Sequence, residues 1–211
     1  TFGFKSKKHN LFENISFSLE ANKIYGLVGT TGVGKSTLLD ILMGIISPLS
    51  GNVYADNIDI NKNLDEWYKC IGYVPQDNFL LNKSILDNVC FAEKKDSNKE
   101  KFKTAIKLSE LEDFIQSLPQ KEGTVVGDRG IQISGGQKQR IGLARALYEE
   151  RKFLAFDEAT SAVDSATESN ILKTLHKIKK NKIIVIIAHR ENTIQSCDHK
   201  IKLINGKIEL S

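Results

Sequence analysis

A glycine-rich segment that ends in Lys and Ser has the residue types and spacing needed to bind phosphate. The segment from Gly29 to Ser36 reads GTTGVGKS and matches the pattern GxxxxGK[ST]. It lies between Lys23–Val28, which is predicted to be a strand, and 36–43, which is predicted to be a helix ending at Gly44. In such a loop successive backbone N–H groups and the helix dipole favour bound phosphate. A tight glycine turn without a chemical role is the weaker alternative, because a strand and a helix flank the loop.

Two side chains in this loop have distinct predicted roles. Lys35 would reach the β- and γ-phosphates of a nucleotide, and the Ser36 hydroxyl would contact Mg²⁺. The residues predicted to contact the nucleotide here are Gly29, Thr30, Thr31, Gly32, Val33, Gly34, Lys35, Ser36 and Thr37.

A pair of carboxylates follows a second apolar segment. Asp157 and Glu158 come directly after 153–156, which reads FLAF and is predicted to be a buried strand. Ligands of open parallel sheets bind at the carboxyl ends of strands, where this pair would lie. We expect Asp157 to support Mg²⁺, directly or through water, and Glu158 to act as general base on the attacking water. The alternative for both is capping of the next helix.

Length and composition favour a single domain with a sub-lobe. The chain has 211 residues, of which 40% are hydrophobic. The longest purely apolar stretch, Ile183 to Ala188, is far shorter than the roughly 20 residues that cross a bilayer. Any membrane role is therefore expected to come from a partner. Three widely spaced cysteines fit neither a disulfide framework nor a zinc site and indicate a reducing cytosol.

Apolar spacing predicts further elements. Continuous apolar runs are typical of parallel strands that are covered on both faces, and Asn-Gly favours a tight hairpin turn. The predictions are a strand at 14–19, a helical lobe with a helix from Ser97 through Leu108, a helix at 111–118 with a capping box of Ser109 and Glu112, a helix from Gly135 to about Tyr148, strands at 152–156 and 183–188, and a hairpin turn at Asn205 and Gly206.

The net charge of +4 is modest. The lysines alternate with apolar or acidic residues and are predicted to form solvated helix faces. Nucleic-acid binding is disfavoured because aromatic residues do not alternate with them. The lysines concerned are Lys99, Lys101, Lys103 and Lys107, together with those from Lys177 to Lys182.

Several further motifs occur in a fixed order and together resemble one family. Residues 133–137 read ISGGQ, which resembles the LSGGQ signature of ABC ATPases. Gln76 in YVPQD matches the Q-loop of that family, 161–164 match its D-loop, and His189 matches its switch histidine. With the phosphate loop and the Asp-Glu pair this makes six ordered motifs, so the resemblance covers essentially the whole chain.

The resemblance implies how the sites are used. ABC ATPase domains form head-to-tail dimers in which the phosphate loop of one subunit and the signature of the other enclose each ATP. His189 would contact the γ-phosphate. Gln76 would touch Mg²⁺ and water while its loop senses a membrane partner. The further nucleotide contacts implied are Ser134, Gly135, Gly136, Gln137 and Asp164.

An aromatic residue near the start resembles the one that stacks on adenine in this family. Phe4 is the expected residue and Phe2 is its rival. A core role for either phenylalanine stays open.

Two segments resemble exporters within the family. Residues 124–130 read TVVGDRG and resemble the exporter segment TEVGERG, with departures at Val125 and Asp128. Residues 84–89 resemble the exporter stretch SIxxNI. The resemblance therefore implies an exporter or flippase with the domain at the cytoplasmic face of the membrane. A start at Thr1 and an end at Ser211 are expected to reflect a longer polypeptide that carries the membrane-spanning half.

The predicted fold is α/β: a P-loop NTPase core with a mainly parallel sheet, an antiparallel β-lobe and an inserted helical lobe. The core would comprise 1–76 and 145–211, and the lobe with the signature 77–144. The predicted reaction is hydrolysis of ATP to ADP and phosphate with Mg²⁺. The alternatives are a soluble ABC ATPase of DNA repair or translation, and a regulatory nucleotide-binding module with a dead site.

Overall fold

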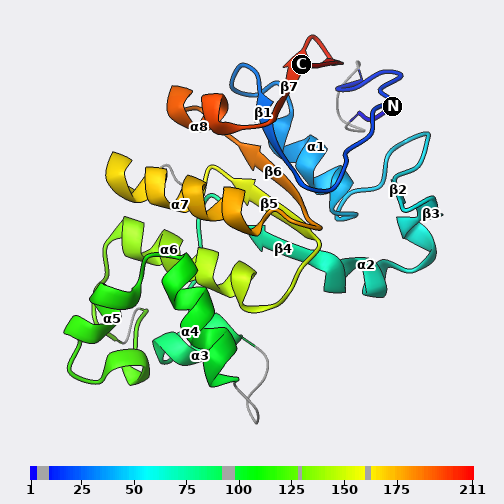
Figure 1. Cartoon of the computed structure of the whole chain (residues 1–211). Coiled ribbons are helices and arrows are strands. Elements are labelled where there is room, and N and C mark those ends of the chain that lie inside the picture. The colour runs from blue at the N-terminus through cyan, green and yellow to red at the C-terminus, as the bar shows by residue number, and fades with distance from the viewer. Residues whose placement is uncertain (4–9, 92–97, 128–129, 160–162) are drawn as a thin grey trace. The chain divides into compact units, whose positions relative to one another are not determined.

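A computed structural model describes residues 1–3, 10–91, 98–127, 130–159 and 163–211 (Figure 1). The chain divides into two compact units. The first comprises Thr1–Ile71, Lys152–Asp157 and Lys179–Ser211, and the second comprises Gly72–Arg151 and Glu158–Ile178. The predicted helical lobe, 77–144, lies within the second unit.

The first unit contains a mostly parallel sheet, as the sequence predicted. Its strands β5, β6, β1, β7 and β8 follow one another in that order across the sheet, and only the last pairing is antiparallel. All five residues of β5 are buried, which explains its unbroken apolar sequence. The strands are β1 (Lys23–Val28), β5 (Phe153–Asp157), β6 (Ile183–Ile187), β7 (His199–Ile204) and β8 (Lys207–Leu210).

The predicted hairpin turn lies between the last two strands. Asn205 and Gly206 have φ angles of 48° and 76°, and Ile204 pairs with Lys207 across the turn. Two consecutive positive φ angles match the twist of the flanking strands, and Asn-Gly adopts them readily. The prediction is confirmed.

The described residues of this unit also form the helices α1, α2 and α8. Helix α1 (Lys35–Leu42) lies against β6, and α8 (Glu191–Ser196) lies against β1. Helix α2 (Leu64–Cys70) follows a short hairpin of β2 (Tyr54–Ala55) and β3 (Ile58–Asp59). This hairpin is the part of the predicted antiparallel lobe that forms a ladder among the described residues.

The predicted strand at 14–19 is wrong. Its side chains do alternate in exposure, with Ile15, Phe17 and Leu19 half-buried, but these residues form no strand. Alternation requires only a chain with one buried face, whereas a strand also needs a neighbour that accepts its ladder hydrogen bonds. The positive φ of 52° at Asn14 also interrupts an extended conformation.

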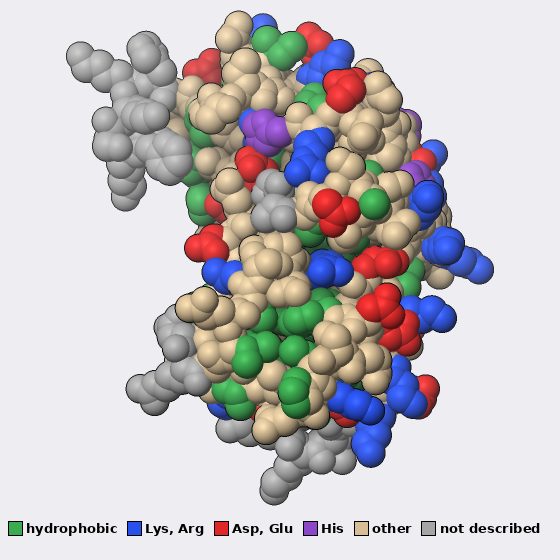
Figure 2. Space-filling model, turned by 90° about the vertical axis from the view of Figure 1, so that its left-hand side faces the viewer, with side chains coloured by type: hydrophobic (Ala, Val, Ile, Leu, Met, Phe, Trp, Pro, Cys, Tyr) green, Lys and Arg blue, Asp and Glu red, His purple; other side chains and the backbone are tan. Residues whose placement is uncertain are grey.

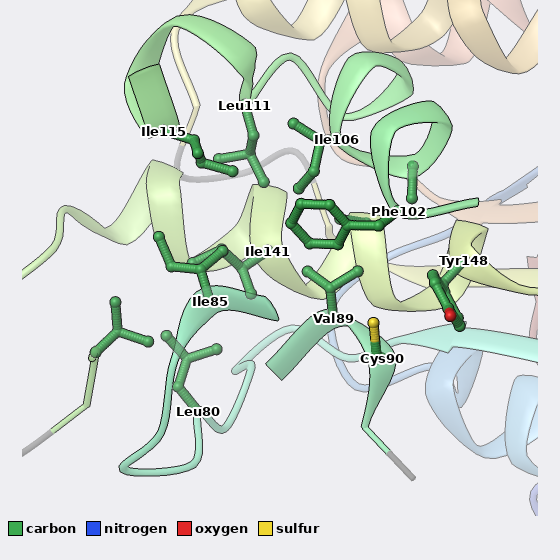
Figure 3. Close-up of a cluster of buried hydrophobic side chains, with 13 residues drawn as sticks. Leu80, Ile85, Val89, Cys90, Phe102, Ile106, Leu111, Ile115, Ile141 and Tyr148 are labelled. Atoms are coloured by element: carbon green, nitrogen blue, oxygen red, sulfur yellow. The ribbon is translucent and has the colours of Figure 1, made fainter. Parts of the chain in front are cut away.

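Helices dominate the second unit, whose first residue, Gly72, lies within β4 (Ile71–Val74). Figure 3 shows that its buried hydrophobic cluster draws side chains from several of them, including Phe102, Ile141 and Tyr148. The predicted helices near 97–108, 111–118 and 135–148 are confirmed. The helices are α3 (Ile85–Cys90), α4 (Lys99–Leu108), α5 (Glu112–Ser117), α6 (Gly135–Tyr148) and α7 (Ser165–Ile178).

The predicted capping box of Ser109 and Glu112 is wrong. The Ser109 hydroxyl is fully buried and donates to the carbonyl of Ala105, at 2.8 Å, and to that of Ile106, at 3.1 Å. Helix α5 begins instead after Leu111, which makes no side-chain cap. Serine can bond either to a carbonyl behind it or to an N–H ahead of it. Here it satisfies the end of α4 rather than the start of α5.

The lysines predicted to be solvated are exposed or half-exposed in the structure. Lys101 pairs with Glu149 at 2.9 Å, and Lys103 pairs with Glu100 at 3.2 Å. Figure 2 shows one face on which blue basic side chains lie among red acidic ones. Among the described residues, no helix has both the length and the apolar character needed to cross a membrane.

Candidate functional site

The glycine-rich loop in the first unit has the backbone of a phosphate cradle. Gly32 and Gly34 have φ angles of 80° and 105°, and Gly34 is the N-cap of α1. An added Cβ at Gly34 would lie 2.8 Å from both Leu11 Cδ2 and Phe12 Cζ. At Gly34 the loop therefore passes too close to neighbouring side chains for any residue but glycine. The N-terminus of α1, which favours bound phosphate, follows directly.

Lys35 is the first residue of α1, and its side chain reaches back to the start of this loop. Its side chain is 7% exposed, and Nζ donates to the carbonyls of Gly29, at 2.9 Å, and Thr30, at 3.1 Å. The ammonium group therefore lies within reach of whatever the loop encloses. Ser36, one residue further along α1, is exposed and free to offer its hydroxyl oxygen to a hard cation. The glycine backbone and these donors fit a nucleotide phosphate with Mg²⁺.

Replacing Gly34 with Ala is expected to lower the free energy of unfolding by about 2–4 kcal/mol, from backbone strain and overpacking together. Gly51→Ala is the matched control, because Gly51 also has a positive φ, 84°, but an added Cβ meets nothing within 4 Å. The control should lose only about 1 kcal/mol. Urea unfolding of both variants measures the difference. Equal losses would contradict the close approach at Gly34.

Strand ends bring three predicted site residues to one edge of the first unit's sheet. Gly29 follows β1 directly, Asp157 is the last residue of β5, and His189 follows β6 by two residues. The three strands are parallel and in register, with Leu27 and Asp157 both opposite Ile187. Asp157 is 8% exposed, whereas His189 is exposed. This is the edge at which parallel α/β sheets bind ligands.

A second carboxylate lies near Asp157, and sequence analysis missed it. The pKa of Asp40 is raised by burial and, to a smaller extent, by the negative charge of Asp157. Asp40 lies one helical turn after Ser36 on α1, and this i, i+4 spacing was the available signal. Two mutually repelling carboxylates favour a cation in their neighbourhood.

The second unit brings together Gln76 and Glu158, which are 82 residues apart in sequence. Gln76 Nε2 donates to Glu158 Oε2 at 3.0 Å. Glu158 is half-buried and has a φ of 50°, a conformation that is uncommon for glutamate and typical of functional positions. Gln76 is exposed. The amide of Gln76 therefore orients one carboxylate oxygen of Glu158.

The signature residues begin α6 with a complete capping box. Ser134 Oγ accepts from the N–H of Gln137 at 3.2 Å, and Gln137 Oε1 accepts from the N–H of Ser134 at 2.8 Å. The Gln137 side chain is thus engaged with its own helix. Gly135 and Gly136 follow the cap, Gly135 is exposed, and neither carries a side chain that would cover the helix N-terminus.

Asp164 caps α7 in a similar way. Its Oδ1 accepts from the N–H groups of Ala166, at 3.1 Å, and Thr167, at 2.9 Å. The Thr167 hydroxyl donates to Oδ2 at 2.7 Å and lowers the pKa of Asp164. Capping of the following helix was the alternative role given for Asp157 and Glu158. The structure shows that role for Asp164. Ser161 and Ala162 of the same motif lie outside the described residues.

The aromatic residues near the start are only partly described. Phe4 lies outside the described residues, as does Asp128 of the segment 124–130. Phe2 is 6% exposed and forms an isolated bridge with Phe12, with ring centroids 6.3 Å apart. The core role that was left open is therefore the role that the structure shows for Phe2.

Comparisons with known proteins agree with this geometry. The chain is 42% identical to "ABC transporter ATM1" of Toxoplasma gondii over 94% of the chain and 18% of that protein. It is 41% identical to "Alpha-hemolysin translocation ATP-binding protein HlyB" of Escherichia coli over 98% of the chain and 29% of that protein. It thus spans less than a third of the length of both relatives.

A solved structure described as a bacterial Atm1-family ABC exporter with ATP bound matches the fold. The TM-score is 0.91 at 34% identity, with 100% of this chain and 37% of that chain covered. The family model described as "ABC transporter" matches residues 12–161, which is more than half of the chain. The chain therefore belongs to the ABC transporter family and is an ATPase domain of that family.

Proposed function

We propose that this domain hydrolyses ATP with Mg²⁺ in a head-to-tail dimer and thereby powers an ABC exporter. The observation that carries the proposal is the hydrogen bond between Gln76 and Glu158 in a chain with an intact phosphate loop. A binding module with a dead site needs no oriented carboxylate. The pair therefore favours turnover over a purely regulatory role.

Each described residue has a definite task in this reaction. Lys35 and the N–H groups of 29–37 hold the phosphates. Glu158 accepts a proton from the water whose oxygen attacks the γ-phosphorus, while the bond to ADP breaks and its electron pair stays on the ADP oxygen. His189 contacts the γ-phosphate, and Gln76 keeps Glu158 oriented.

The oxygen donors suit Mg²⁺. Ser36, Gln76 and Asp157 would hold the ion, and hard oxygen ligands of this kind match its preference. When bound, Mg²⁺ neutralises charge that develops on the phosphate oxygens. Asp157 lies near Asp40, whose pKa is raised by burial and, to a smaller extent, by the charge of Asp157, and a cation there would relieve the repulsion between the two carboxylates.

The exposed start of α6 supports the proposed dimer. Ser134 and Gly135 are exposed, and Gly136 follows them in the first turn of a 14-residue helix. This terminus would complete the ATP site of a second subunit, because a helix N-terminus attracts phosphate. Asp164 would lie at the same interface. Nucleotide then supplies contacts between the two chains, and hydrolysis removes them.

We expect the ATPase rate per mole of protein to rise with protein concentration and then level off, because only the dimer has complete sites. Phosphate release measured from nanomolar to micromolar protein, with light scattering on the same samples, tests this. A constant specific rate in samples that scatter as monomers would contradict the shared site.

Transport is the proposed purpose of the cycle. The relatives are named as transporters, a translocation protein and an exporter, which favours this role over that of a soluble repair or translation ATPase. The partner would be a transmembrane domain on the same longer chain, with this domain on the cytoplasmic face. Phe79 and Val125 of the second unit, 70% and 41% exposed, are candidate contacts for it.

A further inference from the structure

Residues 77–79, the segment directly after Gln76, lie along one face of α6. Lys138, Gly142 and Arg145 are spaced by four and three residues, so they lie on a single face of the helix. Each of these three residues lies beside one residue of the segment, in the same order along the chain. The pairs are Lys138 with Asp77, Gly142 with Asn78, and Arg145 with Phe79.

The ion pair between Lys138 and Asp77 contributes little to the stability of this packing. Lys138 Nζ lies 2.8 Å from Asp77 Oδ1, but the Asp77 side chain is 91% exposed. Exposed ion pairs contribute little because water competes for both charges. Positioning of the segment must therefore come from the other two pairs.

The middle pair requires glycine on the helix. Asn78 is 2% exposed, and its Nδ2 donates to the carbonyl of Pro75 at 3.3 Å. An added Cβ at Gly142 would lie 2.1 Å from Asn78 Oδ1 and 2.4 Å from its Cγ. Because Asn78 is short and buried, it cannot move aside without breaking its bond to the residue before Gln76. The segment can therefore pack closely against α6 at this position because residue 142 has no side chain.

The inner pair belongs to a polar network around the buried Asn88. One guanidinium nitrogen of Arg145, Nη1, donates to the carbonyl of Phe79 at 3.1 Å, and Nε donates to the carbonyl of Asn88 at 2.9 Å. Asn88 is fully buried and exchanges hydrogen bonds with the N–H and C=O of Leu81, at 2.8 and 3.0 Å. The planar fork of arginine suits several acceptors at once. The network holds both sides of Leu80, a member of the cluster in Figure 3.

We propose that this face of α6 is a positioning surface for Gln76. By fixing residues 75–79 along the helix, Gly142 and Arg145 hold the amide of Gln76 at its 3.0 Å contact with Glu158. They are positioning residues, since neither touches the reacting atoms. The inference rests on the proposed ATPase function, and all of its contacts lie within the second unit.

Gly142→Ala tests the inference in the whole 211-residue chain. Turnover at saturating ATP should fall roughly tenfold, because small displacements of an orienting group are costly. The Mg²⁺ concentration for half-maximal activity should rise about threefold, because a displaced Gln76 amide would hold Mg²⁺ less well. Affinity for ATP without turnover should change less than about twofold, because the phosphate loop lies in the other unit.

Two further variants separate positioning from a general loss of stability. Gly123→Ala is the matched control, since an added Cβ there meets nothing within 4 Å in the same unit. Asn78→Ala removes the bond to Pro75 without adding a methyl group to α6, and it should lower turnover and raise the Mg²⁺ requirement in the same way as Gly142→Ala. If Gly142→Ala does not fold, Arg145→Lys serves instead, because it keeps the charge and loses the fork.

The outcomes are distinguishable. A selective loss of turnover and a raised Mg²⁺ requirement, shared by Gly142→Ala and Asn78→Ala, support the positioning surface. Unchanged turnover and Mg²⁺ requirement in folded variants of an active chain would overturn it and leave the ATPase function standing. Absence of Mg²⁺-dependent hydrolysis in the unaltered chain would reject the function and, with it, this inference.

Discussion

Replacing Glu158 with Gln is expected to lower ATP turnover by about 10²- to 10⁴-fold, the range typical of a lost general base. The amide has the shape of the carboxylate but cannot accept the proton of the attacking water. Its oxygen can still accept the hydrogen bond from Gln76, which spans 3.0 Å in the structure. ATP affinity should therefore be preserved, and trapped nucleotide should favour an ATP-dependent dimer. Phosphate release and light scattering measure the two effects.

Glu150→Gln is the matched control, because this exposed glutamate follows α6 and takes no part in the site. It should hydrolyse ATP at the rate of the unaltered chain. Near-normal hydrolysis by the Glu158 variant would remove this residue from the base role and turn attention to His189.

Replacing Lys35 with Met is expected to weaken ATP binding roughly 10- to 100-fold, because charge-assisted hydrogen bonds of this kind contribute about 1.5–3 kcal/mol. Met keeps much of the length and apolar stem of a side chain that is only 7% exposed. The fold should survive, since only two bonds from Nζ to loop carbonyls are lost. Titration with a fluorescent ATP analogue gives the affinity, and a thermal scan checks the fold.

Lys180→Met controls for the loss of one positive charge, since Lys180 is exposed and lies outside the helices and strands. Its affinity for ATP should match that of the unaltered chain. If the Lys35 variant binds equally well, the ammonium group in the loop is not a phosphate ligand.

Much of the first unit could be predicted because its signals are local. The strands β5 and β6 are continuous apolar runs, and their boundaries agree with prediction within one residue. Asn205 and Gly206 specify their turn through their own backbone preferences. The phosphate loop is equally local, because its glycines and Lys35 lie within eight consecutive residues.

The sequence-based predictions failed where the outcome depended on which partner a residue met in the folded chain. Ser109 could cap the helix behind it or the helix ahead of it, and only packing within the second unit decided for α4. The alternating residues 14–19 had the pattern of a strand but lacked the ladder that defines one. Asp40 has no motif of its own, and its proximity to Asp157 depends on how α1 lies against the sheet.

The phosphate loop, the buried strands and the family could all be predicted from sequence alone, because each depends on neighbouring residues in a recognisable order. Only the tertiary structure placed Gln76 beside Glu158 and seated Asn78 against Gly142. These contacts join residues more than 60 positions apart, and their geometry is set by the packing of α6 on the segment after β4. A sequence pattern records which side chains are present, whereas the distance between two of them depends on every element packed between them.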